Sequence, residues 1–273
     1  MQNKQQLIRL KNILFWLIFS ASCFSVSITV QAKTKHWQNS DYIVRSFSTI
    51  ALNSDFTQQN SKIRKWDKNI NYYFVHGITD QPLHEELTKK HLQHLARITG
   101  LNIRQTDQRS QANLVIMFSR EKNMLTDFIR ETGIKATPSV RKLARQSVCL
   151  SNMRFNPMGD INHATVMIPV DRARERAKLL TCIVEELSEV MGLPNDSESV
   201  YPSIFNDKSY HELLTGLDYL MLKMLYDNRI KAGMDKQQAE PILKKIVREY
   251  QQKNIVQTAE LKVMEGELYP LFY

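Results

Sequence analysis

The sequence predicts an α+β protein with a mixed sheet backed by helices and a helical C-terminal part. Two observations support this class. Short aromatic and β-branched runs, such as 71–76 and 112–119, alternate with longer stretches of helical periodicity. The 273 residues contain no internal repeat and no linker-like stretch, and 42% of them are hydrophobic, which suffices for one sizeable core. We therefore expect residues 33–273 to form a single domain.

The first part of this domain is expected to alternate helices and strands. Strands are predicted where aromatic and β-branched residues gather, and glycines such as Gly77 and Gly100 end the elements. The expected order is helix 41–52, strand 71–76, helix 82–98, strands 102–105 and 112–119, helix 120–131, and strands 147–155 and 163–170.

The second part is expected to be mainly helical. Asp171 can cap a helix that runs to Met191 and ends at Gly192. After an irregular segment over 194–207, another helix is expected to start near Asp218, with leucines and methionines on one face. The tail 235–273 is expected to be charged and helical, with an apolar end.

The N-terminus, residues 1–32, has the layout of a secretory signal peptide. Three basic residues precede an apolar stretch over 13–30, and small residues around Ala32 fit a cleavage site. An uncleaved N-terminal anchor is the alternative. No later segment is apolar enough to span a membrane. We therefore expect an exported protein, periplasmic or secreted, that is cleaved near Ala32 and has no transmembrane segment in its mature chain.

The charge balance is basic, at +9 for the whole chain and +6 once the three basic residues of the leader are removed. Basic runs over 62–65 and 172–178 could meet an envelope polymer or a protein partner, although solvated faces are the ordinary alternative. The runs lack the interleaved aromatic residues of a nucleic-acid groove, so nucleic acid is not an expected partner.

Two cysteines, Cys149 and Cys182, remain after removal of the leader. In an oxidising compartment an even pair predicts a disulfide. Such a bond would close a loop of about 34 residues and stabilise the fold by roughly 3–4 kcal/mol. The alternative is a pair of small buried hydrophobic residues.

The helix before Gly192 carries an unusual acidic face. This face holds Glu185, Glu186 and Glu189, with Cys182 between them. No lysine or arginine lies four residues before or after any of these glutamates. The opposite, apolar face holds Leu180, Ile183, Val184, Leu187, Val190 and Met191. A solvated face is the ordinary interpretation. A disulfide at Cys182 would instead pack protein against the first turn, so that the acidic face becomes the wall of a groove.

This acidic pattern, Glu-Glu-x-x-Glu-x-x-Gly, resembles the zinc motif His-Glu-x-x-His-x-x-Gly. In that motif two histidines bind zinc and the glutamate activates water. Here Glu185 and Glu189 take the histidine positions, and Glu186 takes the position of the general base. Gly192 takes the turn position, and Asn195 or Asp196 falls where a third ligand would come.

The resemblance continues downstream, into the turn and helix that follow the zinc helix in matrixin-like metzincins. Those proteins have a Ser-Ile-Met turn and then a helix with an aspartate that ends in Leu-Tyr-Gly, whereas this chain has Ser203-Ile204-Phe205, then Asp218, then Leu225-Tyr226-Asp227. Residues 180–227 therefore resemble a metzincin C-terminal half whose metal ligands are replaced. The resemblance implies a zincin-like fold, with Phe205 in place of the methionine beneath the metal.

The chain also resembles a proteobacterial family of exported proteins, domain-of-unknown-function family 2927. The resemblance covers about residues 42–234 and includes Arg64-Lys65-Trp66. The other signatures of the family, EEL…GLPND, SIFND, LT..D and LYD…GM, match Glu185–Leu187, Gly192–Asp196, Ser203–Asp207, Leu214–Asp218 and Leu225–Met234.

The replaced ligands predict no zinc, because zinc prefers nitrogen and sulfur donors. No cofactor is expected, although a divalent cation such as Ca²⁺ or Mg²⁺ could bind the carboxylates with help from the loop at Asn195 and Asp196. Without a metal, the clustered glutamates should raise one another's pKa. His84, His91 and His94 share a helix stripe with leucines, so we expect partly buried core histidines rather than ligands.

The leading functional hypothesis is an exported binding or envelope-associated protein that lacks zinc protease activity. Glu185, Glu189, Asn195 and Asp196 would hold a basic or polymeric ligand. The alternative is a hydrolase in which Glu186 is the general base, with or without a bound metal. A third hypothesis is a structural role, with the acidic face bound to basic residues of a partner. Substrate, oligomeric state and pathway stay open.

Overall fold

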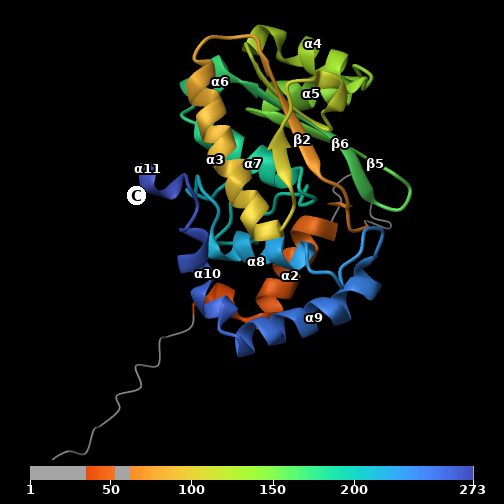
Figure 1. The fold of residues 1–273 in the computed structure, drawn as a ribbon, viewed down its shortest axis with the longest axis vertical. Coiled ribbons are helices and arrows are strands. Elements are labelled where there is room, and N and C mark those ends of the chain that lie inside the picture. The colour runs from red at the N-terminus through yellow and green to blue at the C-terminus, as the bar shows by residue number, and fades with distance from the viewer. Residues whose placement is uncertain (1–34, 53–61, 273) are drawn as a thin grey trace, which may run out of the picture. The chain divides into compact units, whose positions relative to one another are not determined.

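Six strands form one sheet within the residues that the computed structural model describes, 35–52 and 62–272 (Figure 1). The strand order is β1-β6-β4-β2-β3, and β5 pairs with β6. β5 runs antiparallel to β6, whereas the other pairs are parallel, so the sheet is mixed. The strands are β1 Lys65–Trp66, β2 Ile70–His76, β3 Ile103–Gln105, β4 Leu114–Ser119, β5 Leu150–Phe155 and β6 Asp160–Pro169.

Helices pack against this sheet and gather at one end of it (Figure 1). α7 (Leu179–Glu189) packs on β5, β6 and α3 (Gln81–Thr99), whereas α4 (Glu121–Thr132) packs on β4, β6 and α5 (Pro138–Gln146). The helices α2, α8, α9 and α10 form a group of their own. The remaining elements are η1 His36–Gln38, α2 Ser40–Leu52, η2 Arg109–Gln111, α6 Val170–Glu175, α8 Gly216–Leu225, α9 Lys236–Gln252, α10 Ile255–Val263 and α11 Tyr269–Phe272.

The alternation of side chains along β4 shows that the sheet is covered on both faces. Ile116 and Phe118 point into the larger core, which also holds the apolar side of α7. Val115 and Met117 point into a smaller core with Met124 of α4. Because successive strand residues face opposite sides, a strand buried throughout is the expected centre of a layered fold. The predicted α+β class is confirmed.

The three histidines of α3 lie in the core, as predicted. His84, His91 and His94 are 0%, 1% and 5% exposed. Burial lowers the pKa of His91 to about 3 and that of His94 to about 4. The Nε2 atom of His91 lies 3.0 Å from Oγ of Ser188, so this contact joins α3 to the helix that carries the glutamates.

The predicted capping role of Asp171 is wrong. The expected single helix is divided into α6 and α7 by a break at Ala177, whose φ is 53°. Asp171 lies in the first turn of α6, and its Oδ1 accepts a hydrogen bond of 2.7 Å from the backbone N–H of Glu121, at the start of α4. Lys178 precedes α7 without any side-chain cap. The periodic pattern missed this break because an alanine at positive φ gives no glycine signal.

The expected signal peptide, residues 1–32, lies outside the described residues. The described residues, 35–52 and 62–272, cluster into one compact unit. In the described part of the chain, none of the helices combines the length and the apolar composition that crossing a membrane would require.

Candidate functional site

α7 is amphipathic in the way that its sequence predicts. Ile183, Val184 and Leu187 are fully buried, and so are Val190 and Met191 just beyond the helix end. Leu180 is half-buried against the same core. Anchoring of this apolar side fixes the rotation of the helix, so the three glutamates project from the opposite side.

That opposite side lines a cavity of about 1040 Å³. One wall is α7, and a second wall is the segment from Ser147 to Met153, which includes most of β5. In the described residues β5 pairs with β6 alone. The loops after α7 complete the lining with Pro194–Glu198 and parts of 204–211. We call this cavity the acidic groove because its acidic lining residues are Glu185, Glu186, Glu189, Asp196, Glu198 and Asp207.

The glutamates are neither freely solvated nor paired with basic residues in the described chain. Glu186 is only 7% exposed, and Glu185 and Glu189 are half-buried. Burial, followed by the charge of Glu189, raises the pKa of Glu185 to about 9. Burial and the neighbouring carboxylates also raise the pKa values of Glu186 and Glu189 well above the usual range. At neutral pH the empty groove therefore retains protons on this cluster.

Glu186 and Glu189 form a carboxyl pair. They lie three residues apart on α7, and the Oγ atom of Ser151 donates a hydrogen bond of 2.7 Å to Oε2 of Glu189. Burial and the charges of neighbouring carboxylates raise the pKa of both groups, so the two do not both ionise readily at neutral pH. The arrangement can store and release a proton at a wall of the groove.

The zinc of the metzincin motif does not fit these residues. The positions of its histidine ligands hold Glu185 and Glu189, and among the described residues that line the groove His211 is the single histidine. Glu185, Glu189 and Asp196 do come together, with one oxygen of each lying within 4.8 Å of the others. This all-oxygen set suits a hard cation better than zinc. The side-chain nitrogen of Asn195 donates to the carbonyl of Ile50 at 2.7 Å, so this residue also fastens the loop.

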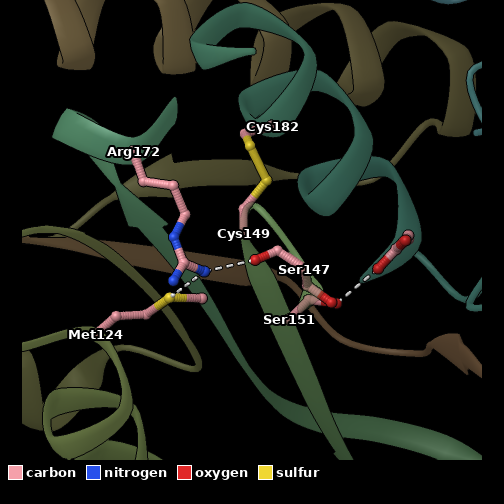
Figure 2. The surroundings of a disulfide bond; sticks show 7 residues. Met124, Ser147, Cys149, Ser151, Arg172 and Cys182 are labelled. Carbon is pink, nitrogen blue, oxygen red and sulfur yellow. Dashed lines mark hydrogen bonds between the residues drawn. A yellow bond between two sulfur atoms is a disulfide. The ribbon is translucent and has the colours of Figure 1, made fainter. Parts of the chain in front are cut away.

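The predicted disulfide between Cys149 and Cys182 is confirmed. It joins α7 to the segment that enters β5, with the two Cα atoms 5.9 Å apart (Figure 2). Arg172 lies beside this segment and donates to the carbonyl of Ser147 (Figure 2). It also donates to the carbonyl of Ala144 and is paired with Glu121. Two walls of the groove are thus tied together covalently, and the chain leading into the disulfide is held by a buried arginine.

Gly192 and its neighbours fix the end of α7. Gly192 has a φ of 112°, and a side chain there would collide with the carbonyl of Arg64. Nε1 of Trp66 donates a hydrogen bond of 2.7 Å to the carbonyl of Val190. The hydroxyl of Tyr226 donates a hydrogen bond of 2.8 Å to the carbonyl of Met191. Glycine is required at this position because the backbone has a positive φ and because the carbonyl of Arg64 leaves no room for a side chain.

Asp218 positions the turn that contains Phe205. It is fully buried, and it accepts hydrogen bonds from the hydroxyl of Ser203, from the backbone of Ile204 at 3.1 Å and from the backbone of Thr215 at 2.7 Å. Burial raises its pKa to about 6 despite these bonds. Phe205 is fully buried, while Ile204 lines the groove.

Sequence reasoning missed two side chains of the groove. Ser151 is an ordinary strand residue in a run of mixed polarity, and nothing local indicates that it meets a glutamate. Arg64 belongs to the basic run 62–65 and to the Arg64-Lys65-Trp66 signature, but neither pattern indicates that its side chain reaches the groove. The available signal for a role in the groove was a basic residue, Arg64, next to two residues with structural roles, Lys65 and Trp66.

The comparisons with known proteins agree with this picture at the level of family. A family model described as "Protein of unknown function (DUF2927)" matches residues 40–245. No curated protein matches the chain. The matched region contains α7, β5, the disulfide and the whole acidic groove. The match spans well over half of the 273 residues, so the chain belongs to the DUF2927 family of proteins of unknown function.

Proposed function

We propose that the protein is an exported binding protein, periplasmic or secreted, that holds a cationic ligand or polymer segment in the acidic groove and has no zinc protease activity. One observation carries the proposal. Glu185, Glu186, Glu189 and Asp196 surround a single cavity of about 1040 Å³, and burial raises the pKa of the three glutamates.

A cationic group is the occupant that this site favours most. The glutamates cannot all ionise in the empty groove because of burial and mutual repulsion. A bound ammonium or guanidinium group removes both obstacles, since it supplies opposite charge and replaces water as a hydrogen-bond partner. The cavity is also large enough for several residues of a chain, within the volume range of ligand sites.

Two features support export. Residues 1–32 have the layout of a signal peptide. The Cys149–Cys182 disulfide suits an oxidising compartment, where such bonds persist.

The test is calorimetric titration of the mature protein with N-acetyl-trilysine amide, a peptide whose only charges are three ammonium groups. We expect saturable binding that a Glu185→Gln, Glu189→Gln double variant weakens at least about tenfold, since charge-assisted hydrogen bonds contribute about 1.5–3 kcal/mol each. Glu240→Gln, which removes a carboxylate of α9 that is paired with Lys244 outside the groove, is the matched control. Unchanged affinity in the double variant would remove the proposal.

A hydrolase is the second candidate, and the Glu186–Glu189 pair favours it. A carboxyl group with a raised pKa beside a second carboxyl group is a source of general acid–base catalysis. The test is turnover of a fluorogenic peptide and ester panel by the wild type and by Glu186→Gln. Turnover that disappears in Glu186→Gln, with unchanged thermal unfolding, would establish catalysis. If the wild type shows no turnover, binding is the proposed function that stays.

A divalent cation is the further occupant that Glu185, Glu189 and Asp196 could hold. Oxygen donors from α7 and the following loop match the preferences of Ca²⁺ and Mg²⁺. Elemental analysis of the purified mature protein checks this directly. A stoichiometric Ca²⁺ or Mg²⁺ content that falls in Glu185→Gln would show that a metal ion is the cation bound in the groove. Stoichiometric zinc would contradict the argument that these oxygen ligands do not suit zinc.

A further inference from the structure

Arg64 lines the acidic groove from a rigid position beside the end of α7. The backbone of Ile63 is hydrogen-bonded to Met234 and Gly233, and that of Lys65 is bonded to Gly159. The close approach of Gly192 to the carbonyl of Arg64 holds the same point from the α7 side. The guanidinium is therefore carried by a backbone that is fixed on both sides.

The two residues that follow Arg64 have structural roles, and Arg64 itself does not share them. Nζ of Lys65 donates to the carbonyls of Leu225 and Ile230 at 2.7 and 3.0 Å, which closes the end of α8. Trp66 closes the end of α7 through Val190. Among the described residues, the side chain of Arg64 makes no hydrogen bond and no ion pair.

That isolation is unusual among the arginines that are withdrawn from solvent. In the described chain three arginines are buried or half-buried, namely Arg64, Arg172 and Arg229. Arg172 pairs with Glu121, and Arg229 pairs with Asp227 and Glu249. Only Arg64 has no carboxylate partner in the described residues, and burial lowers its pKa accordingly. A partly desolvated cation without a partner is costly, which indicates that a ligand supplies the missing anion.

The geometry of Arg64 leaves its donors available. Its guanidinium carbon lies 3.9 Å from the ring centroid of Phe155, at the end of β5. Contact with an aromatic ring uses the face of the planar group and leaves its N–H donors, which lie in the plane, free to bind a planar anion in a bidentate manner. The ring also shields one face of the guanidinium from water.

We propose that Arg64 binds a carboxylate of the ligand in the acidic groove, so that this ligand carries a carboxylate as well as positive charge. This inference rests on the proposed function and names its ligand class, a zwitterionic, peptide-like molecule. A carboxylate is favoured over a phosphate because the groove already holds several acidic residues, and a phosphate group carries about twice the charge and is repelled more strongly.

The test uses two matched probes, N-acetyl-trilysine with a free carboxylate and N-acetyl-trilysine amide. Simple attraction to an acidic groove would favour the amide, which has the higher net charge. We expect the reverse: the wild type binds the carboxylate peptide about tenfold more tightly. In Arg64→Met this preference is expected to disappear, so that the amide binds at least as tightly as the carboxylate peptide. Arg64→Lys, which keeps the charge but not the planar fork, is expected to retain only part of the preference.

Arg154→Met is the control, because Arg154 is exposed on β5 and does not line the groove. It should leave both affinities unchanged. Thermal unfolding of each variant checks that loss of the contact with Phe155 has not disrupted the fold, and Arg64→Lys serves if Arg64→Met is unstable. Equal binding of both peptides by the wild type would overturn the role of Arg64 and leave the cationic groove standing. Failure of both peptides to bind would overturn the proposed function and this inference together.

Discussion

Ser151 on β5 donates a hydrogen bond of 2.7 Å to Glu189 on α7, and this bond spans the two walls of the acidic groove. Ser151 follows Cys149, the residue just before β5, by two positions, so a disulfide and a hydrogen bond both join this part of the chain to α7. The bond also favours the ionised form of Glu189, against the burial that disfavours it.

Removal of this hydroxyl should weaken the groove as a cation site. In Ser151→Ala we expect the pKa of Glu189 to rise further and the affinity for N-acetyl-trilysine amide at pH 7 to fall about three- to tenfold, since one hydrogen bond to a charged group is lost. Calorimetric titration measures the change. Ser139→Ala, an exposed serine on α5, should have no effect. Equal affinity in the wild type and Ser151→Ala would show that the bond does not tune the acid cluster.

The disulfide should contribute much of the stability. Its cysteines are 33 positions apart, and chain-entropy reasoning gives roughly 3–4 kcal/mol for a loop of this length. We expect the Cys149→Ser, Cys182→Ser double variant to lose about that much free energy of unfolding in urea. A thiol assay on the unreduced, denatured wild type should find no reactive thiol from these two residues. Two reactive thiols would contradict the bond.

The buried histidines should make the protein sensitive to acid. Their folded-state pKa values, about 3 for His91 and about 4 for His94, lie below the ordinary value of 6.5. Between these folded-state values and 6.5 the unfolded state therefore binds more protons than the folded state. The stability that the two neutral histidines contribute is fully present above pH 6.5 and is lost as pH falls toward 4.

His91→Gln isolates this effect, because glutamine does not titrate. Between pH 7 and pH 4 the variant should lose roughly 1–3 kcal/mol less free energy of unfolding than the wild type. His36→Gln, an exposed position, is the control and should follow the wild type. Parallel pH curves for His91→Gln and the wild type would refute the assignment.

Asp218 should be required for the turn beneath the groove. Asp218→Ala removes the acceptor for three hydrogen bonds and leaves a cavity, so we expect a loss of about 2–4 kcal/mol in the free energy of unfolding. Asp235→Ala removes the exposed N-cap hydrogen bond of α9 and should cost only about 1 kcal/mol. Similar losses in both variants would show that Asp218 acts only as an ordinary helix cap.

Periodicity and cysteine parity predicted the parts of the molecule that depend on local pattern. The two faces of α7 follow from the spacing of Ile183, Val184 and Leu187, and the disulfide follows from an even pair. The spacing of a known motif also grouped Glu185 and Glu189 with Asn195 or Asp196, and of these two it is Asp196 that lies near both glutamates.

What sequence reasoning missed depends on contacts between distant segments or on short elements. β1 has two residues, too few for any period, and it exists because Lys65 and Trp66 pair with β6. α5 was not predicted, although Thr137 caps it and Pro138 opens it, because its sequence is mostly polar. The meeting of Arg64 with Gly192 spans more than a hundred positions and leaves no local signal.

The central claim, that a cation replaces protons in the acidic groove, is tested most directly by counting protons released on binding. The measurement is calorimetric titration of N-acetyl-trilysine amide at pH 7 in buffers of different ionisation enthalpy. Because the pKa of Glu185 is raised to about 9, the free groove is protonated there, and a bound cation should expel a proton. We expect release of about one proton per peptide or more, reduced in the Glu185→Gln, Glu189→Gln variant. Binding without proton release, or no binding, would contradict the account.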